Sequence, residues 1–260
     1  RLPDQWSGLG KTVNTPLTQI VVLAGGTATR MRPITEKIPK ALIPIDETKN
    51  LPFAHFQAAW LARQGFRQVI FSIGYRGEMI RDYLGNGERY GLEIQYMEDG
   101  PVLLGTGGAL RKIHDAGLLH DHFFVTYGDS FLPIDHQAVA AAFLSRKVPA
   151  LMTVIRNEGK WDESNAECEK EWVIRYDKRK DITGKERMKF IDYGLLAFNR
   201  ETVARSLPEG KSDLAPPLTR LAEERRLAAF EVAERFYEIG SPSGLNDFRS
   251  LVIQKPEMFG

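Results

Sequence analysis

The residues best suited to chemistry form one run, in which a glycine pair and several basic residues follow an apolar stretch. Residues 21–45 read VVLAGGTATRMRPITEKIPKALIPI, with Gly25 and Gly26 after the apolar residues and Arg30 and Lys40 further along. Proteins hold phosphate oxygens with exposed backbone N–H groups of glycine-rich turns and with planar guanidinium groups. Prolines at positions 33 and 39 stiffen the loop, so its cationic side chains lose less entropy on binding. The run therefore predicts a polyphosphate site.

Two familiar phosphate loops do not fit this run, and a plain turn remains the alternative. A dinucleotide fingerprint, G-x-G-x-x-G, runs straight into a helix, but Met31 stands at its last position and two prolines follow. A P-loop needs G-K-[ST], which this run lacks. A glycine pair after a strand often does no more than end the strand. The hydroxyls of Thr27 and Thr29 favour the phosphate interpretation, because they add donors beside the turn.

Apolar runs and helical patterns alternate through the first half of the chain. Residues 19–24 are apolar, rich in β-branched types and closed by glycine, which is typical of a buried parallel strand. Further strands are predicted at residues 67–74, 92–97, 122–130 and 150–156, and helices at residues 53–61, 78–84, 107–113 and 136–146. This order predicts an α/β fold with a doubly wound, mostly parallel (mixed) sheet. Ligands bind such sheets outside the carboxyl ends of the strands, here in the loops starting at Gly25, Pro101 and Gly128.

The pattern changes after residue 156. Residues 172–198 indicate two strands joined by a charged turn, and helices near 201–207 and 217–226, a strand at 235–240 and a short helix from Pro242 follow. No linker, repeat or low-complexity segment separates the halves. The predicted organisation is an N-terminal extension at 1–18, an α/β core at 19–156, which the resemblance described below makes nucleotide-binding, and a subdomain at 157–260 that closes the same domain.

Composition narrows the class of partner. The 260 residues include 35 basic and 34 acidic side chains, so the chain lacks the positive field with which proteins hold a nucleic acid backbone. No apolar run approaches the roughly 18–20 residues of a membrane span, and the first residues have no signal-peptide core. The lone Cys168 cannot form an internal disulfide. We expect a soluble, cytoplasmic protein without nucleic acid or membrane partners, whose oligomeric state stays open, a homo-oligomer included.

The run at residues 23–45 resembles the N-terminal signature of the sugar-1-phosphate nucleotidyltransferases, or nucleotide-sugar pyrophosphorylases, LAGG-x-GTR-(L/M)-RPLT followed by PK. PVLLGTGGAL, YGDS, RYDKR, DYGLLAF and FYEIGSPSG are similar to the family's later motifs, in order, over about residues 19–255. The short bacterial heptose and hexose members are the most similar in character. The resemblance implies a Rossmann-like nucleotidyltransferase fold with a small sugar-binding subdomain at 157–260. Ala28 replaces the family's usual glycine, and Glu238 replaces the aspartate of many members.

The resemblance also implies a nucleotide site and a Mg²⁺ site. Residues carried over to the nucleotide site are Ala24, Gly25, Gly26, Thr27, Thr29, Gly105, Thr106 and Gly107. A nucleoside triphosphate and a sugar phosphate together bring about five negative charges, which need a metal and fixed cations. Asp129 ends a predicted strand and matches one metal carboxylate, and Glu238 matches the other; all-oxygen ligation suits Mg²⁺. The alternatives are a glycine-rich helix entry at GTGGAL, an Asx-turn at Asp129 and a solvent-facing strand residue at Glu238.

A sugar-phosphate site follows from the resemblance of the later motifs. Lys178 would contact the sugar phosphate, Asp177 a sugar hydroxyl, and Gly194 would lie under the sugar with Asp192 beside it. A solvated charged turn is the alternative for RYDKR.

The implied reaction joins a sugar 1-phosphate to an NTP by direct in-line displacement, releasing an NDP-sugar and pyrophosphate. Arg30 would hold the β- and γ-phosphates, and Lys40 and Lys178 would draw the two substrates together, with Arg30, Lys40 and Asp129 as the catalytic set. Two other classes stay open, a non-catalytic nucleotide-sugar-binding regulator and a metal-dependent glycosyltransferase. The latter typically carries Asp-x-Asp, whereas Ser130 and Phe131 follow Asp129. The sequence determines neither the base nor the sugar.

Overall fold

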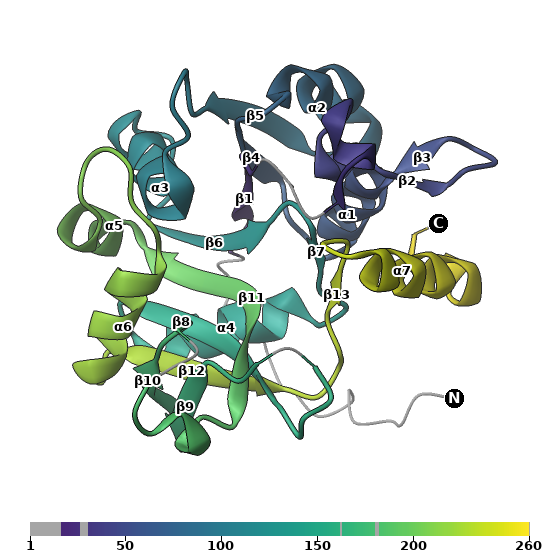
Figure 1. Cartoon of the computed structure of the whole chain (residues 1–260). Coiled ribbons are helices and arrows are strands. Elements are labelled where there is room, and N and C mark those ends of the chain that lie inside the picture. The colour runs from purple at the N-terminus through teal and green to yellow at the C-terminus, as the bar shows by residue number, and fades with distance from the viewer. Residues whose placement is uncertain (1–16, 27–30, 162, 180–181, 260) are drawn as a thin grey trace.

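The computed structural model describes residues 17–26, 31–161, 163–179 and 182–259 (Figure 1). Its described residues form a sheet of nine strands in the order β5-β4-β1-β6-β11-β8-β12-β10-β9. The strands of the first half are β1 (Gln19–Ala24), β4 (Gln68–Ile73), β5 (Glu93–Glu98), β6 (His122–Tyr127) and β8 (Ala150–Arg156). Those of the second half are β9 (Ala166–Glu169), β10 (Trp172–Tyr176), β11 (Phe190–Asn199) and β12 (Leu227–Val232). Strands from both sides of residue 156 therefore belong to one sheet.

The sheet is mixed, as predicted. β5, β4, β1 and β6 are parallel, with Ile20 of β1 opposite Val69 of β4 and Phe124 of β6. β11 lies antiparallel between β6 and β8, and β12 is parallel to β8. The prediction of a doubly wound α/β fold is confirmed.

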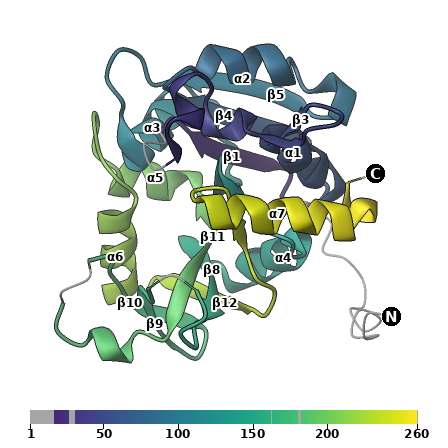
Figure 2. The same ribbon diagram turned by 45° about the vertical axis from the view of Figure 1, so that its right-hand side comes forward.

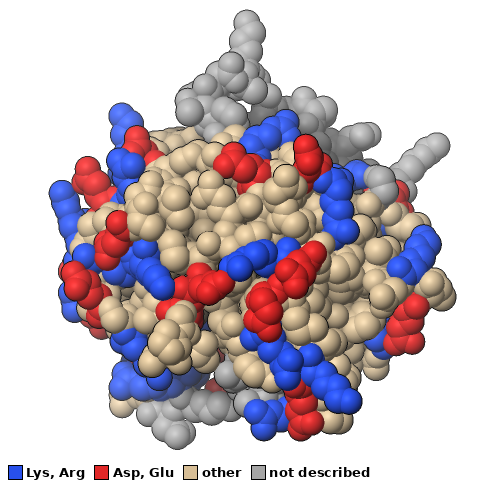
Figure 3. Space-filling view, turned by 90° about the horizontal axis from the view of Figure 1, so that it is seen from above, with Lys and Arg blue, Asp and Glu red and all other residues tan. Residues whose placement is uncertain are grey.

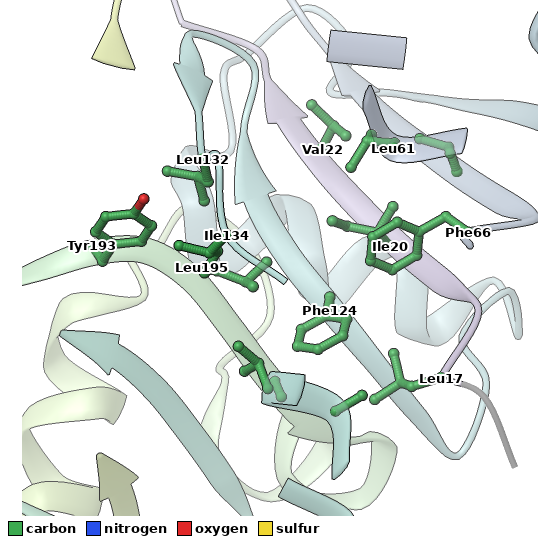
Figure 4. Close-up of a cluster of buried hydrophobic side chains, with 14 of the residues drawn as sticks. Leu17, Ile20, Val22, Leu61, Phe66, Phe124, Leu132, Ile134, Tyr193 and Leu195 are labelled. Carbon is green, nitrogen blue, oxygen red and sulfur yellow. The ribbon is translucent and has the colours of Figure 1, made fainter. Parts of the chain in front are cut away.

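Helices cover both faces of the sheet. Helices α1 (Phe53–Arg63), α2 (Gly77–Leu84) and α4 (His136–Arg146) cover one face, and α3 (Gly105–Asp115), α5 (Arg200–Ser206) and α6 (Ala215–Glu223) cover the other. Successive residues of β1 alternate between the faces, so Ile20 and Val22 pack with α1 while Val21 packs with α3. Figure 4 shows Ile20 and Val22 in the apolar cluster between the sheet and α1, with Val22 close to Leu61. Full burial of such aliphatic side chains contributes about 1.5–3 kcal/mol each.

A separate apolar cluster packs the C-terminal helix against the first half of the chain. Helix α7 (Pro242–Gln254) lies beside the hairpin of β2 (Pro44–Asp46) and β3 (Leu51–Pro52) (Figures 1 and 2). Its Phe248 ring lies 4.9 Å from that of Phe53 and 5.0 Å from that of Phe131, between ring centroids. Phe131 belongs to β7 (Ser130–Phe131), which pairs with β13 (Tyr237–Glu238). The cluster also contains Met31 and Ile43, so it supports the chain before and after Lys40 as well as β7, which begins directly after Asp129.

Most predicted elements are present, but the hairpin strands β2 and β3 and two strands of the main sheet were not predicted. The two strands of the main sheet that were not predicted are β9, whose four residues AECE give no apolar pattern, and β12, LAAFEV, which directly follows the helix predicted at 217–226. β12 is buried because it adds to β8 over six residue pairs, a contact between distant parts of the chain. No described helix combines the length and the apolar character that crossing a membrane requires.

On the face of the molecule in Figure 3, Lys and Arg side chains are interspersed with Asp and Glu side chains.

Candidate active site

A cavity of about 300 Å³ lies at the carboxyl ends of β1, β4 and β6. It is lined by Leu23, Ala24, Gly25, Gly26, Lys40, Ala41, Ser72, Asp99, Leu103, Gly105, Thr106, Ala109, Tyr127, Gly128, Asp129 and Asp213. Most of these residues come from the ends of four neighbouring strands and from the start of α3, where ligands bind in open α/β sheets, whereas Lys40 and Ala41 follow Pro39 and Asp213 precedes α6. The volume is at the lower end of the range for small-molecule sites.

The turn after β1 packs closely against the turn after β4. A Cβ atom placed on Gly74 would lie 2.6 Å from the carbonyl oxygen of Gly25, so only glycine fits there without a shift. Gly25 and Gly26 both line the cavity, as the sequence analysis predicts for nucleotide-binding residues. The expected ligands Thr27, Thr29 and Arg30, and the substituted position Ala28, lie outside the described residues.

Lys40 and Asp129 meet in the cavity. Lys40 begins the short 3-10 helix η3 (Lys40–Leu42) directly after Pro39, and Asp129 follows β6. The Lys40 Nζ atom lies 2.6 Å from Asp129 Oδ2, and the two side chains are 22% and 32% exposed. Two residues that were predicted to act together, 89 positions apart, therefore form a direct ion pair within reach of a ligand.

The loop that carries Asp129 is held by hydrogen bonds from a side chain that was not predicted to have this role. Gln57 of α1 is buried, and its Nε2 donates to the carbonyl oxygens of Tyr127 at 2.9 Å and Ser130 at 2.8 Å. These two residues flank the Gly128–Asp129 pair, so Gln57 positions the carboxylate. A glutamine on the apolar face of a predicted helix is the only sequence signal for this contact.

Glu238 is brought near Asp129 by the pairing of two short strands. β13 pairs with β7 so that Glu238 is opposite Ser130, and the N–H of Ile239 donates to the Asp129 carbonyl oxygen at 3.0 Å. Burial, followed by the negative charges of nearby carboxylates, Asp129 and Glu238 among them, raises the pKa of Tyr127. Both carboxylates thus lie within electrostatic range of one phenol.

The acids in this region fit a Mg²⁺ ion that is shared with substrate. No described group of three or more His, Cys, Asp or Glu side chains could hold a metal by itself. Mg²⁺ in phosphoryl-transfer sites commonly takes one or two carboxylates and completes its shell with substrate phosphates and water. Asp129 and Glu238 suit that arrangement, since both offer only oxygen atoms.

Three of the four predicted sugar-phosphate residues cluster beside the cavity. Lys178 Nζ lies 3.7 Å from Asp192 Oδ2 and 5.8 Å from the ring centroid of Tyr127, which lines the cavity. Asp192 is 3% exposed and accepts hydrogen bonds from Tyr176 Oη at 2.9 Å and from the Gly194 N–H at 3.1 Å. Gly194 has φ +102°, which favours glycine.

The fourth residue, Asp177, is engaged with its own neighbour. Its carboxylate accepts from the backbone N–H of Arg179 at 2.9 Å and from the guanidinium at 2.6 Å. Hydrogen bonds from Arg179 hold the pKa of Asp177 at about 2. In this arrangement the Asp177 carboxylate is occupied by Arg179.

The glycines at the start of α3 have a packing role. The N–H groups of Gly107 and Gly108 both donate to the carbonyl oxygen of Ser212, at 2.9 and 3.1 Å. A Cβ atom on Gly105 would lie 2.6 Å from that same oxygen. Gly105 and Thr106 line the cavity, whereas Gly107 does not, so the N–H of Gly107 serves the loop at residues 210–213 and not the cavity. Sequence analysis gave this loop no role.

Asp99 is a buried cavity residue that was not predicted. Asp99 follows β5, lines the cavity and is only 8% exposed. The sequence predicted a role in the site for the loop starting at Pro101, but no role for the acid that precedes this loop.

Comparison with known proteins identifies the family. Residues 19–164, more than half of the chain, match the sequence profile of the family described as "Nucleotidyl transferase". The chain belongs to the nucleotidyl transferase family. The cavity lies within the part of the fold that carries this match, apart from Asp213.

Named relatives of this nucleotidyl transferase act on different sugars. It is 35% identical over 130 residues to D-glycero-alpha-D-manno-heptose 1-phosphate guanylyltransferase of Aneurinibacillus thermoaerophilus, covering 50% of this chain and 54% of that protein. It is 33% identical over 144 residues to UTP--glucose-1-phosphate uridylyltransferase of Synechocystis sp., covering 52% and 36%. The chain thus spans about a third to a half of the length of these curated relatives.

A solved structure supports the fold over nearly the whole chain. HddC from Yersinia pseudotuberculosis complexed with GMP-PN matches with a TM-score of 0.71 and 20% sequence identity, covering 90% of this chain and 98% of the other. At this identity the likeness shows the fold, and it extends through the second half, beyond the region of the family profile.

Proposed function

We propose that this nucleotidyl transferase joins a sugar 1-phosphate, a heptose or hexose phosphate, to a nucleoside triphosphate and releases pyrophosphate. The observation that carries the proposal is the Lys40–Asp129 pair in a cavity at the carboxyl ends of the parallel strands. The named relatives use sugar 1-phosphates, with guanylyl and uridylyl transfer both represented.

The cavity would receive the nucleotide. Its lining at the turn after β1 and at the start of α3 supports binding of the phosphates and base, respectively. Arg30, which the resemblance assigns to the β- and γ-phosphates, follows Gly25 and Gly26 in the sequence. Lys40 would neutralise negative charge on the triphosphate, because its Nζ atom lies in the cavity beside the Asp129 carboxylate.

The second substrate would bind beside Tyr127. Lys178 supplies a half-exposed ammonium group there, next to the buried Asp192 carboxylate, and Gly194 adds no side chain to the space beside Tyr127. An oxygen of the sugar phosphate would then attack the α-phosphorus, and the bond from the α-phosphorus to pyrophosphate would break. No protein nucleophile takes part, so catalysis rests on alignment and charge neutralisation.

We further propose that Asp129 and Glu238 hold Mg²⁺ together with the substrate phosphates. The ion would supply positive charge against the phosphates of the bound substrates. We also propose that the protein is a cytoplasmic enzyme of nucleotide-sugar biosynthesis that acts on small molecules, as a monomer or a homo-oligomer.

The test is a pyrophosphate-release assay on the full chain with Mg²⁺, four common triphosphates and a panel of sugar 1-phosphates. We expect release with at least one pair, and a loss of kcat of roughly 10²- to 10³-fold in Arg30→Ala, the value for one transition-state contact.

Two outcomes would replace the proposal. Binding of a nucleotide sugar without pyrophosphate release or exchange for any pair would indicate the regulatory homologue. Release of a nucleoside diphosphate from an NDP-sugar donor would indicate a glycosyltransferase.

A further inference from the structure

The buried carboxylate of Asp99 has no part in the chemistry above. It is the residue directly after β5, and β5 pairs in parallel with β4 up to Glu98. The side chain is 8% exposed, yet it lines the cavity together with Leu103, Gly105 and Thr106. It therefore lies at the α3 side of the cavity, away from the Lys40–Asp129 pair, which belongs to the β6 side.

The carboxylate retains acceptor capacity toward the cavity. Its Oδ2 accepts the N–H of Leu104 at 3.1 Å, and its Oδ1 lies 3.5 Å from Ser72 Oγ, at the limit of a hydrogen bond. The nearby Lys112 ammonium donates to the carbonyl oxygens of Glu98 at 2.7 Å and Asp99 at 3.3 Å. An ionised carboxylate has about four acceptor sites, so these donors leave some unused.

The surroundings make unused acceptors costly in the absence of a ligand. Burial raises the pKa of Asp99, and the hydrogen bonds from Leu104 and Ser72 offset this only in part. A Cβ atom on Gly25 would lie 3.1 Å from Asp99 Oδ2, so the glycine keeps this oxygen accessible. Apolar side chains of Leu23, Leu103 and Ala109 line the same cavity and offer contacts to a flat ring.

We propose that Asp99 reads the nucleobase and selects guanine. The inference rests on the proposed nucleotide-binding function and names the base that this function left open. A carboxylate accepts two parallel hydrogen bonds, and guanine presents two adjacent donors, N1–H and the 2-amino group, on one edge. The bound base supplies the donors that the buried carboxylate lacks.

The other bases do not match this edge. Adenine and cytosine each place a ring-nitrogen acceptor next to their amino group, and uracil and thymine flank a single N–H with two carbonyl oxygens. Each would set an acceptor against the carboxylate, and a site built for particular donors rejects ligands that lack them. Asp213, the other carboxylate in the lining besides Asp129, is exposed, so solvent satisfies it without a ligand.

The experiment measures nucleotide affinity by calorimetry, without a sugar phosphate, on the full chain with Mg²⁺. Wild-type protein is titrated with GTP, ITP, XTP and UTP. Inosine lacks only the 2-amino group, so we expect GTP to bind roughly 10- to 100-fold more tightly than ITP, the value of one hydrogen bond to a charged group. UTP should bind more weakly than GTP as well.

The matched variants are Asp99→Asn and Asp213→Asn. The amide introduced by Asp99→Asn would present one acceptor and one donor, which fits the N1–H and the 2-carbonyl of xanthine. We therefore expect Asp99→Asn to lose the preference for GTP over ITP and to bind XTP more tightly than GTP, whereas Asp213→Asn keeps the wild-type order. Thermal unfolding of each variant verifies the fold, and the wild-type GTP/ITP ratio tests the inference without any variant.

The outcomes separate this inference from the proposed function. Equal affinity of wild-type protein for GTP and ITP, a preference for UTP, or an unchanged GTP/ITP ratio in Asp99→Asn would overturn the role of Asp99, even if pyrophosphate is released. Selective GTP binding that depends on Asp99, with no pyrophosphate released from any sugar phosphate, would support the inference and reject the proposed reaction.

Discussion

Two lysine–aspartate pairs border the site, and they are built differently. In the first, Lys40 lies 2.6 Å from Asp129, and both side chains are partly exposed to the cavity. In the second, Lys178 is half exposed and lies 3.7 Å from Asp192, which is almost completely buried. Water or a ligand can reach either partner of the first pair. In the second pair the acid is buried and held in place, whereas the half-exposed lysine can leave the acid to bind a ligand.

The difference follows from what supports each carboxylate. Asp192 receives hydrogen bonds from Tyr176 Oη and from the Gly194 N–H, so its orientation does not depend on Lys178. Asp129 is positioned through its backbone, by Gln57 contacts to the flanking carbonyls, and its carboxylate has Lys40 as a strong partner. We infer that the first pair serves the reacting phosphates and the second serves substrate recognition.

The largest effect is expected from Asp129→Asn. The amide keeps the size of the side chain but removes the charge that faces Lys40 and the proposed Mg²⁺ site, so kcat for pyrophosphate release should fall roughly 10²- to 10³-fold. Asp82→Asn, on the exposed surface of α2, is the matched control and should leave kcat unchanged. A near-native kcat in Asp129→Asn would remove this carboxylate from the reaction.

A smaller and different effect is expected from Lys178→Met. The methionine keeps the length of the side chain and loses one charged hydrogen bond to the sugar phosphate, worth about 1.5–3 kcal/mol. KM for the sugar phosphate should rise roughly 10- to 100-fold, whereas the affinity for triphosphate, measured by calorimetry, stays the same. If the triphosphate affinity falls equally, the two pairs do not divide the substrates as we infer.

Gly194→Ala tests the support of the second pair. The new Cβ atom would contact nothing closer than 3.8 Å, so the cost comes from the φ of +102° and should lower the free energy of unfolding by about 1–2 kcal/mol. Gly91→Ala, at φ +72° with open space around it, should lose a similar amount in urea titrations. Only Gly194→Ala should also raise KM for the sugar phosphate; an unchanged KM would place the sugar elsewhere.

The smallest effect concerns the competition between Lys40 and a divalent ion for Asp129. A partly exposed ion pair is worth about 0.2–1 kcal/mol, so Lys40→Met should increase Mn²⁺ affinity up to about fivefold in the absence of nucleotide. Electron paramagnetic resonance of free Mn²⁺ measures this directly. Weaker Mn²⁺ binding in Lys40→Met would show that the ammonium does not compete for this carboxylate.

The sequence determined the fold class and the chemical types at the site. The alternation of apolar runs with helical patterns predicted the sheet, because strand and helix periodicities are local properties of the chain. The rule that parallel strands end at one edge then brought Gly25, Lys40 and Asp129 to a common cavity, as expected. The resemblance added Lys178, Asp192 and Gly194, which lie together beside it.

Only the tertiary structure decided which donor and acceptor groups form hydrogen bonds with one another. The N–H of Gly107 is occupied by Ser212, more than a hundred positions away, and Asp177 by Arg179. The roles of Gln57 and Asp99 could not be predicted from the sequence, because the function of a buried amide or carboxylate depends on the carbonyls, helices and strand ends packed around it. Periodicity and motif spacing carry local information, whereas burial and hydrogen-bond partners depend on contacts between distant segments.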